Sequence, residues 1–401
     1  MPNHLSKGMP QIKPEVESFA RIKVIGIGGS GKNTVNHMLN SKVKGVEFIV
    51  INTDAQDLHH SLAKKKIHIG KNLTRGLGTG MNPELGKRAV EETKEEVQEA
   101  IKGADMVFIA GGMGGGTASG AAPVVARTAK ESGCLTVAVV TKPFFFEGQQ
   151  RMKIAETAID ELKQAVDALI IIPNDRLLQT VEKNISAKNA FAICDNILRE
   201  AVEGISDLIT TPGIINIDFA DVRSVLENSG AALMGIGSAS GENRAAEAAR
   251  AAISSPLLEI AINGAKGVLF SIAGGDDLTM FEIQDAAKVI TESVDPNAKI
   301  IFGTIRDDKL KKGEIKITVI ASNFPEGNLV RGSKSSSLFQ GFSNEETPSK
   351  GKIFNTMPAS EKSSKDMDAK KPVNAPVAAQ IEDNDDDWSA VPAFLRRSKL
   401  K

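Results

Sequence analysis

Residues 26–34, with the sequence GIGGSGKNT, have the residue types and spacing of a phosphate-binding loop. Their glycines match the dinucleotide fingerprint GxGxxG. Gly26, Gly31 and Lys32 also nearly match the P-loop pattern GxxxxGK followed by Ser or Thr, but Asn33 stands where a hydroxyl should bind magnesium. A third interpretation is a different kind of phosphate-binding loop, and this stretch alone does not decide among the three.

A second glycine-rich stretch, GGMGGGTASG at residues 111–120, favours the third interpretation. It follows an apolar run typical of a buried strand, and Pro123 suits the first turn of a helix that we expect over residues 120–130. Backbone N–H groups in such a loop and the N-terminus of the helix both attract an anion. Asp54 has the spacing of a ribose-binding acid, but the dinucleotide interpretation leaves this second loop without a role. The sequence therefore predicts one phosphate site divided between two loops.

The segments that would position these loops alternate between apolar strands and helices from Arg21 onward. Apolar runs that are nearly continuous predict parallel strands covered by helices on both faces. These runs lie at residues 22–27, 47–52, 105–110, 135–140 and 168–173, and a helical stretch lies at 83–102. Ligands bind at the carboxyl ends of such strands, and both glycine-rich loops directly follow a strand.

A long amphipathic pattern at residues 186–210 predicts a central helix, because apolar residues recur at three- and four-residue steps. They are Phe191, Cys194, Leu198, Ala201 and Ile205. The following residues alternate again, with strand-like runs at 267–275, 299–305 and 314–321 but no glycine-rich phosphate loop. We expect an α/β protein in which a parallel-sheet nucleotide-binding domain at 21–185 is joined by this helix to a smaller α+β domain at 211–324.

Both ends of the chain differ in composition from this folded part. Residues 1–20 predict a flexible arm, and residues 325–380, rich in Ser, Lys, Pro, Asn and Gly, predict a disordered linker. The last segment, 381–401, combines apolar and basic residues, which is typical of a docking peptide at the end of a tether; the alternative is a solubilising tail. Its candidate partner-binding residues are Val391, Pro392, Phe394, Leu395, Arg396 and Arg397.

The composition argues against several classes of protein. The net charge of −1 over 401 residues gives no overall attraction to nucleic acid or to an anionic membrane. No apolar run reaches the ~20 residues of a membrane span, and the polar N-terminus has no signal-peptide pattern. The two cysteines, Cys134 and Cys194, fit a reducing compartment, so we expect a cytoplasmic protein. The histidines and lysines at residues 59–68 are interpreted as a solvated loop rather than a metal site.

The stretch GGMGGGTASG resembles the signature GGGTGTG or GGGTGSG of the tubulin/FtsZ family of GTPases. Further similar stretches follow in order along the chain: NTDAQ (52–56), TRGLGTGMNPELG (74–86), PFFFEG (143–148), IPNDRLL (172–178), NIDFADV (216–222) and VPAFLRR (391–397). The resemblance covers residues 20–324 and the terminal peptide, and it is closest to the bacterial cell-division members of the family. It implies a tubulin-like GTP-binding domain, GTP or GDP with Mg²⁺ as ligands, and a GTPase that polymerises into the division ring.

The resemblance also implies which residues contact the nucleotide. In the first loop they are Gly28, Gly29, Ser30, Gly31, Lys32 and Asn33, and in the signature loop they are Gly112, Gly114, Gly115, Gly116, Thr117, Ala118, Ser119 and Gly120. Ribose contacts fall on Glu147 and Arg151, and the base pocket on Asn174, Phe191 and Asp195. Ser30, Lys32, Ala118 and Ser119 depart from the residues usual in the family. Lys32 either adds positive charge near the phosphates or points to solvent.

Part of the base pocket also follows from the residues themselves. Phe191 and Asp195 are four residues apart, so they share one face of the central helix. An aromatic ring can stack on a purine, while a carboxylate accepts hydrogen bonds from the N1–H and amino groups of guanine, a donor pair that adenine lacks. Taken alone, Phe191 is more typical of a core residue. A carboxylate on a mostly apolar helix is what indicates a site.

Asn216, Asp218 and Asp221 form the candidate catalytic group. From the residues alone, Asp218 is also a good cap for a helix starting near Ala220. The resemblance implies that this loop enters the nucleotide site of the next subunit, where the two carboxylates polarise the attacking water and Asn216 helps to orient it. Such a shared site implies head-to-tail contacts and filaments.

The expected partners are copies of the same chain and, through the terminal peptide, membrane-tethering division proteins at mid-cell, near the inner face of the membrane. Nucleic acid and direct membrane insertion are not expected. Two alternatives stay open. Ala118 and Ser119 leave room for a polymerising GTP-binding relative with weak turnover. An NAD-dependent dehydrogenase would use GIGGSG but would leave NIDFADV unexplained.

Overall fold

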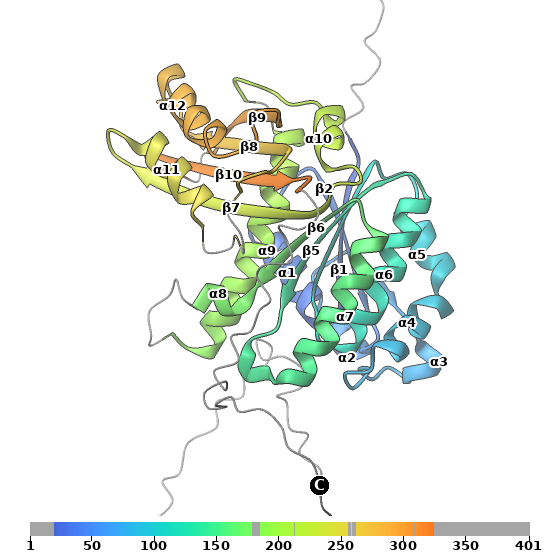
Figure 1. Ribbon diagram of the computed structural model, residues 1–401. Helices are drawn as coiled ribbons and strands as arrows, with labels where there is room; N and C mark the ends of the chain where they lie inside the picture. The colour runs from blue at the N-terminus through green and yellow to red at the C-terminus, as the bar shows by residue number, and fades with distance from the viewer. Residues whose placement is uncertain are drawn as a thin grey trace, which may run out of the picture. The chain divides into compact units, whose positions relative to one another are not determined.

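The computed structural model describes residues 20–178, 185–211, 213–255, 258, 262–307 and 310–324. The predicted arm up to residue 19, the linker at 325–380 and the terminal peptide at 381–401, with its candidate partner-binding residues, lie outside the described residues. Within the described part, ten strands form one sheet in the order β3-β2-β1-β4-β5-β6-β7-β10-β8-β9 (Figure 1).

The first six strands along the chain pair in parallel, as expected for apolar runs that are buried on both faces. The predicted runs are confirmed as β1 (Ile22–Ile27), β2 (Val46–Asn52), β4 (Met106–Gly112), β5 (Leu135–Lys142) and β6 (Ala168–Pro173). The interpretation of residues 59–68 as a solvated loop is wrong in part, because Lys65–His68 forms the edge strand β3. Its Ile67 is buried and pairs with Ile51. A four-residue edge strand offers too short an apolar pattern to be recognised.

Helices cover both faces of the parallel strands, in two separate core clusters. One face carries α1 (Gly28–Asn40) and α9 (Ala187–Thr210), and the other carries α4 (Pro83–Glu92), α5 (Lys94–Ile101), α6 (Gly116–Glu131) and α7 (Gln149–Ala165), which lie together in Figure 1. Shorter helices lie in the connections: α2 (Ala55–His59), α3 (Lys71–Thr74), η1 (Phe145–Glu147) and α8 (Asn174–Leu178). The helical stretch predicted at 83–102 is interrupted at Thr93, whose backbone leaves the helical region at φ −120° and ψ 26°.

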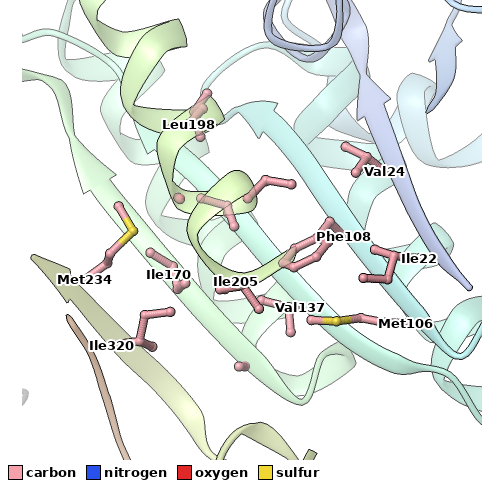
Figure 2. Packing of buried hydrophobic residues seen from close by; sticks show 14 of the residues in the cluster. Ile22, Val24, Met106, Phe108, Val137, Ile170, Leu198, Ile205, Met234 and Ile320 are labelled. Atoms are coloured by element: carbon pink, nitrogen blue, oxygen red, sulfur yellow. The ribbon is translucent and has the colours of Figure 1, made fainter. Parts of the chain in front are cut away.

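Helix α9 is the predicted central helix, and its apolar face is confirmed. Leu198, Ala201 and Ile205 are fully buried. Figure 2 shows Leu198 and Ile205 over the sheet, in a cluster that also contains Met234 and Ile320 from the second part of the chain. Helix α9 therefore contributes to a core that both parts of the sheet share. Within the described residues, none of the helices combines the length and the apolar character that a membrane span requires.

The residues after α9 form the second part of the sheet, with mixed strand directions that confirm the smaller α+β domain. Its elements are α10 (Phe219–Leu226), β7 (Gly230–Ser240), α11 (Arg244–Ile253), β8 (Gly267–Gly274), α12 (Met280–Thr291), β9 (Lys299–Arg306) and β10 (Glu314–Ser322). Strand β7 pairs in parallel with β6 at residues 230–232 and antiparallel with β10 along most of its length. Strand β10 pairs antiparallel with β8, and β8 pairs in parallel with β9. The sheet is therefore continuous across the two parts.

Candidate functional site

A cavity of about 820 Å³ lies at the carboxyl ends of the parallel strands, with α1 and α9 among its walls. It brings together most of the predicted nucleotide contacts: Gly28, Gly29, Ser30, Asn33, Gly112, Gly115, Gly116, Thr117, Ala118, Glu147, Arg151, Asn174, Phe191 and Asp195. The other predicted contacts do not line it: Gly31, Lys32, Gly114, Ser119 and Gly120. Because parallel strands end at one edge of a sheet, residues far apart in the sequence meet there.

The first glycine-rich loop is the first turn of α1. Strand β1 leads directly into the helix at Gly28, whose φ of +72° is a backbone conformation that side chains rarely adopt. The N-cap residue, Ile27, provides no side-chain hydrogen bond to the helix. The N–H groups of the first turn therefore remain available to an anion in the cavity, which the helix dipole also favours.

The second glycine-rich loop is likewise the start of a helix, and here the sequence prediction of the helix start was wrong. Helix α6 begins at Gly116 rather than near residue 120, so Pro123 lies inside the helix and not in its first turn. Ala118, which lines the cavity, is part of this first helical segment and has no positive φ. Its methyl group therefore imposes no backbone strain. Ser119 lies at the base of the loop, where its hydroxyl accepts a hydrogen bond of 2.9 Å from the N–H of Gly114.

The early start of α6 follows from close packing against α4. A Cβ atom at Gly116 or at Gly120 would overlap the backbone at Asn82, Pro83 or Lys87. Glycine at both positions lets α4 cross α6 at short range, which outweighs the poor helix propensity of a glycine run. Gly120 therefore faces α4, on the side of the helix away from the cavity, and serves packing.

Hydroxyl groups connect the second loop to the segment that follows β2 and to the stretch TRGLGTGMNPELG. The hydroxyl of Thr53 lies 2.9 Å from that of Thr117 at the start of α6, and Thr117 lies 3.3 Å from the hydroxyl of Thr79. All three side chains are buried. Buried polar groups that are paired in this way hold their loops in a fixed relation, so the cradle is built before a ligand enters.

Lys32 and Asp57 form a buried ion pair beneath the first loop. The Nζ atom of Lys32 lies 2.9 Å from Oδ1 of Asp57, and both side chains are almost fully buried. The other carboxylate oxygen, Oδ2, accepts a hydrogen bond of 2.9 Å from the side-chain amide of Asn52. The expectation that Lys32 points to solvent is therefore wrong, and its side chain does not line the cavity.

At the other end of the cavity, Phe191 and Asp195 are partly buried residues of α9 that line the cavity wall. The ring of Phe191 makes an edge-to-face contact with Phe144, with centroids 5.3 Å apart. Oδ1 of Asp195 accepts a hydrogen bond of 3.1 Å from the hydroxyl of Thr34. Burial raises the pKa of the Asp195 carboxyl to about 7, while the hydrogen bond from Thr34 and the charge of Lys32 act in the opposite direction.

Asn174 contributes an acceptor to the same cavity. Its side-chain Oδ1 is buried and has no hydrogen-bond partner among the described residues. Buried polar atoms are nearly always paired, so this oxygen fits a donor from a bound ligand. Near the mouth, Glu147 and Arg151 form an ion pair of 3.3 Å, and Glu147 also accepts a hydrogen bond from the N–H of Phe144.

Sequence reasoning did not single out other residues of the lining. Lys188 and His37 lie on the walls made by α9 and α1, and Gly80 and Met81 belong to the stretch TRGLGTGMNPELG. Met81 has a φ of +65°, which is uncommon for a residue other than glycine. The paired glycines of that stretch were the available signal for a loop at the cavity.

The candidate catalytic residues are not in the cavity. Asp218 is the N-cap of α10 and accepts a hydrogen bond from the N–H of Ala220, and Asp221 accepts one from the N–H of Asp218. Oδ1 of Asn216 accepts a hydrogen bond of 2.7 Å from the N–H of Gly213. The capping that the sequence suggested for Asp218 is therefore present, and the three side chains are exposed.

The loop that carries Asn216, Asp218 and Asp221, called the acid loop below, lies at the amino ends of the parallel strands. Asp218 and Phe219 share a hollow with Arg21 and Asp105, which directly precede β1 and β4. Since a six-residue strand spans about 20 Å, the acids and the large cavity are separated by the length of the parallel strands. Figure 1 shows α10 toward the top of the view and α2, whose Asp57 lines the cavity, toward the bottom.

Comparison with known proteins agrees with this arrangement. Residues 21–182 match the Tubulin/FtsZ family, GTPase domain, and residues 230–325 match the FtsZ family, C-terminal domain. An empty FtsZ dimer from M. jannaschii superposes with a TM-score of 0.74 at 45% identity, over 76% of this chain and 89% of that chain. The chain belongs to the tubulin/FtsZ family of GTPases.

Two further solved structures, with lower sequence identity, share the fold alone. The CetZ2 protofilament with GTPγS from Haloferax volcanii has a TM-score of 0.67 at 20% identity, over 78% of this chain and 96% of that chain. The GDP-bound CetZ1 monomer from the same organism has a TM-score of 0.66 at 23% identity, over 76% of this chain and 95% of that chain. Membership of the tubulin/FtsZ family implies that the chain binds a guanine nucleotide.

Proposed function

We propose that this chain binds GTP in the large cavity, polymerises head to tail, and hydrolyses the GTP only where the acid loop of one subunit meets the cavity of the next. The observation that carries this proposal is the separation of the two groups. Asp218 and Asp221 lie at the amino edge of the sheet, whereas the cavity lies at the carboxyl edge. A general base must lie within hydrogen-bonding reach of its water, so one chain cannot supply both halves of the site.

The cavity has the groups that select guanine. Asp195, when ionised, accepts two hydrogen bonds from the N1–H and amino groups of the base, and Phe191 offers a ring beside it. The unpaired Oδ1 of Asn174 accepts a further donor. Adenine lacks this donor pair and would leave the buried Asp195 carboxylate with only its hydrogen bond from Thr34, and such a loss is what gives strong discrimination.

The two loops then receive the phosphates on the N-termini of α1 and α6. Within the described residues there is no group of three or more His, Cys, Asp or Glu side chains that could hold a metal ion. Mg²⁺ therefore fits as an ion held mainly by phosphate oxygens and water, which is how this ion is commonly bound beside nucleotides. There it would neutralise phosphate charge.

Exposed apolar side chains at both ends support a head-to-tail contact. Phe145 and Phe146 are 74% and 59% exposed beside the cavity mouth, and Ile214 is 70% exposed next to the acid loop. Met280 and Phe281, at the start of α12, are also exposed. Large exposed apolar groups of this kind mark interaction sites. An interface that joins two different surfaces does not close on itself, so it yields a filament.

A complementation experiment tests the shared site. Asp195→Asn impairs the cavity and Asp221→Ala impairs the acid loop, so each variant alone should hydrolyse GTP very slowly. In an equal mixture, about a quarter of the junctions join an intact cavity to an intact acid loop if the chains mix at random, and activity should return to that fraction of wild type. Sedimentation of both chains in one polymer is the control. A mixture of copolymerised variants that stays inactive would contradict the proposal.

The concentration dependence of hydrolysis gives a second test. Activity per subunit should rise with protein concentration, because each junction needs two chains. A rate per subunit that is independent of concentration over the range where polymer forms would rule out a shared site.

We further propose that the filaments form the division ring and that the terminal peptide at residues 391–397 docks onto membrane-tethering division proteins. The support is the resemblance of VPAFLRR to the family's terminal motif, since these residues lie outside the described part of the chain. Removing residues 391–401 should leave GTP hydrolysis unchanged and abolish recruitment of filaments to vesicles that carry such a tethering protein. Equal recruitment with and without the peptide would exclude this role.

A further inference from the structure

The ion pair between Lys32 and Asp57 lies directly under the phosphate end of the cavity, and its two members face different surroundings. Asp57 lines the cavity, whereas Lys32 does not. A Cβ atom placed on Gly29 of the first loop would lie 3.6 Å from Oδ2 of Asp57. The carboxylate is therefore next to the N–H groups that favour a phosphate, and the ammonium group lies behind it.

A carboxylate in this position opposes the binding of a polyphosphate. Two like charges about 5 Å apart repel one another strongly at the effective dielectric constant near a protein surface. Asp54 also lines the cavity, but its carboxylate caps α2 through the N–H of Asp57 and is offset by that helix N-terminus. The charge of Asp57 is offset instead by Lys32, at 2.9 Å.

Lys32 in turn depends on Asp57. It is the fifth residue of α1, and its side chain is only 5% exposed. A buried ammonium group without a partner is strongly unfavourable. Each of the two side chains therefore needs the charge of the other, although only Asp57 lines the cavity.

We propose that Lys32 is a positioning residue that neutralises Asp57 from behind, and that this neutralisation lets the cavity accept a triphosphate. Lys32 acts through Asp57 and does not touch the ligand, unlike the lysine of a P-loop. The inference rests on the proposed function of the cavity as a GTP site. It assigns a role to a residue that the sequence pattern left unexplained.

The test compares ligands that differ only in phosphate charge. Dissociation constants for GTP, GDP, GMP and guanosine are measured by calorimetry for wild type, Lys32→Met, Asp57→Asn and the double variant. Because Lys32 also lowers the pKa of Asp195, the titrations are run at about pH 8.5, where that carboxyl is ionised in every variant.

Lys32→Met should weaken GTP binding roughly tenfold to hundredfold, GDP binding less, and guanosine binding by about twofold at most. Asp57→Asn should leave GTP binding equal or tighter. The double variant, in which neither side chain is charged, should bind GTP within about threefold of wild type. Restoration by a second neutral substitution is not expected for a lysine that contacts phosphate directly.

Two results would overturn the proposal: a double variant as weak toward GTP as Lys32→Met, or a loss for guanosine equal to the loss for GTP. If Lys32→Met alone fails to fold, the double variant is compared with Asp57→Asn: GTP binding at least about tenfold weaker in the double variant would show that Lys32 acts without Asp57 and would overturn the proposal. Wild type that binds guanosine no more weakly than GTP, or that binds neither, would instead refute the proposed function.

A matched control comes from the amino edge of the same sheet. Lys130 and Asp167 form a comparable ion pair, with Nζ 3.0 Å from Oδ1 and a buried carboxylate, away from the cavity lining. Lys130→Met should lower the melting temperature, because the buried Asp167 carboxylate loses its ammonium partner, yet leave the ratio of GTP to guanosine affinity unchanged. An equal change in that ratio for Lys130→Met would show that the effect of Lys32 is not specific.

Discussion

The candidate functional groups at the carboxyl edge of the parallel sheet differ from those at the amino edge in their burial and in their hydrogen-bond partners. At the carboxyl edge the polar side chains are buried and paired with one another, as in Thr53 with Thr117 and Lys32 with Asp57. At the amino edge Asp218 and Asp221 are exposed and are bonded to the backbone of their own helix start. Under the proposed function, this difference means that the ligand cradle is complete within one chain, whereas the acid loop becomes catalytic only against another subunit.

The largest expected effect comes from a substitution at the amino edge that lowers GTP hydrolysis without changing GTP binding. Asp221→Asn keeps a side chain that can cap α10 but removes the carboxylate, and GTP hydrolysis per subunit should fall by about 10²–10⁴-fold. GTP affinity should stay within about twofold of wild type, because Asp221 lies at the other edge of the sheet. Phosphate release and nucleotide titration measure the two quantities. Asp160→Asn, an exposed acid on α7, is the control, and an equal loss of GTP binding in Asp221→Asn would break the comparison.

A second prediction compares two glycines of the second loop at the carboxyl edge. Gly120 packs against α4, whereas Gly115 lines the cavity. Gly120→Ala should lower the free energy of unfolding by about 2–3 kcal/mol, because the new methyl group overlaps the backbone of α4. Gly115→Ala, with no atom within 4 Å of the added Cβ, should cost less than about 1 kcal/mol. Denaturant unfolding measures both. Equal destabilisation would show that the α4–α6 contact is not what requires glycine.

The pH dependence of guanine binding gives a third, smaller effect. Burial raises the pKa of Asp195 in the empty site to about 7, and the donors of guanine require the ionised form. Affinity for GDP should therefore be full above about pH 8 and fall about tenfold by pH 6. His37→Asn removes the histidine that lines the same cavity and should leave this profile in place. A flat profile for wild type would exclude Asp195 as the guanine acceptor.

The smallest effect concerns the exposed apolar residues that would join one edge to the other. Phe281→Ser should raise the critical concentration for assembly about fivefold, a typical cost of removing one aromatic interface residue. GTP affinity of the unassembled chain should not change. Sedimentation at several protein concentrations measures assembly. An unchanged critical concentration would place the head-to-tail contact elsewhere.

Local patterns were enough to predict much of this fold. The five apolar strand runs and the face of α9 follow from short-range periodicity, and the structure has them within a few residues. Strand β7, with the sequence GAALMGIGSAS, was not predicted, because its small residues show no clear alternation of apolar and polar side chains. It is a strand because β6 and β10 pair with it on either side. Strand formation there is a tertiary effect, which sequence propensity does not contain.

The candidate site shows the same limit. Glycine loops, Phe191 and Asp195 were predictable because their residue types and spacing point directly to a ligand. The first turn of α6 was not, since it depends on how closely α4 approaches Gly116 and Gly120. The ion pair of Lys32 could not be predicted either, because its partner, Asp57, is 25 positions away on another helix. Contacts between side chains on different elements are decided by packing rather than by pattern.

The capping box at the start of α10 affects when the acid loop becomes ordered. Because the carboxylates of Asp218 and Asp221 already hold backbone N–H groups in the single chain, the entropy of ordering this segment is lost during folding and not during assembly. Two preformed surfaces can then meet with little rearrangement. The rate at which a chain joins a filament should therefore be set by diffusion and orientation, and the newly formed junction should be competent for hydrolysis as soon as it closes.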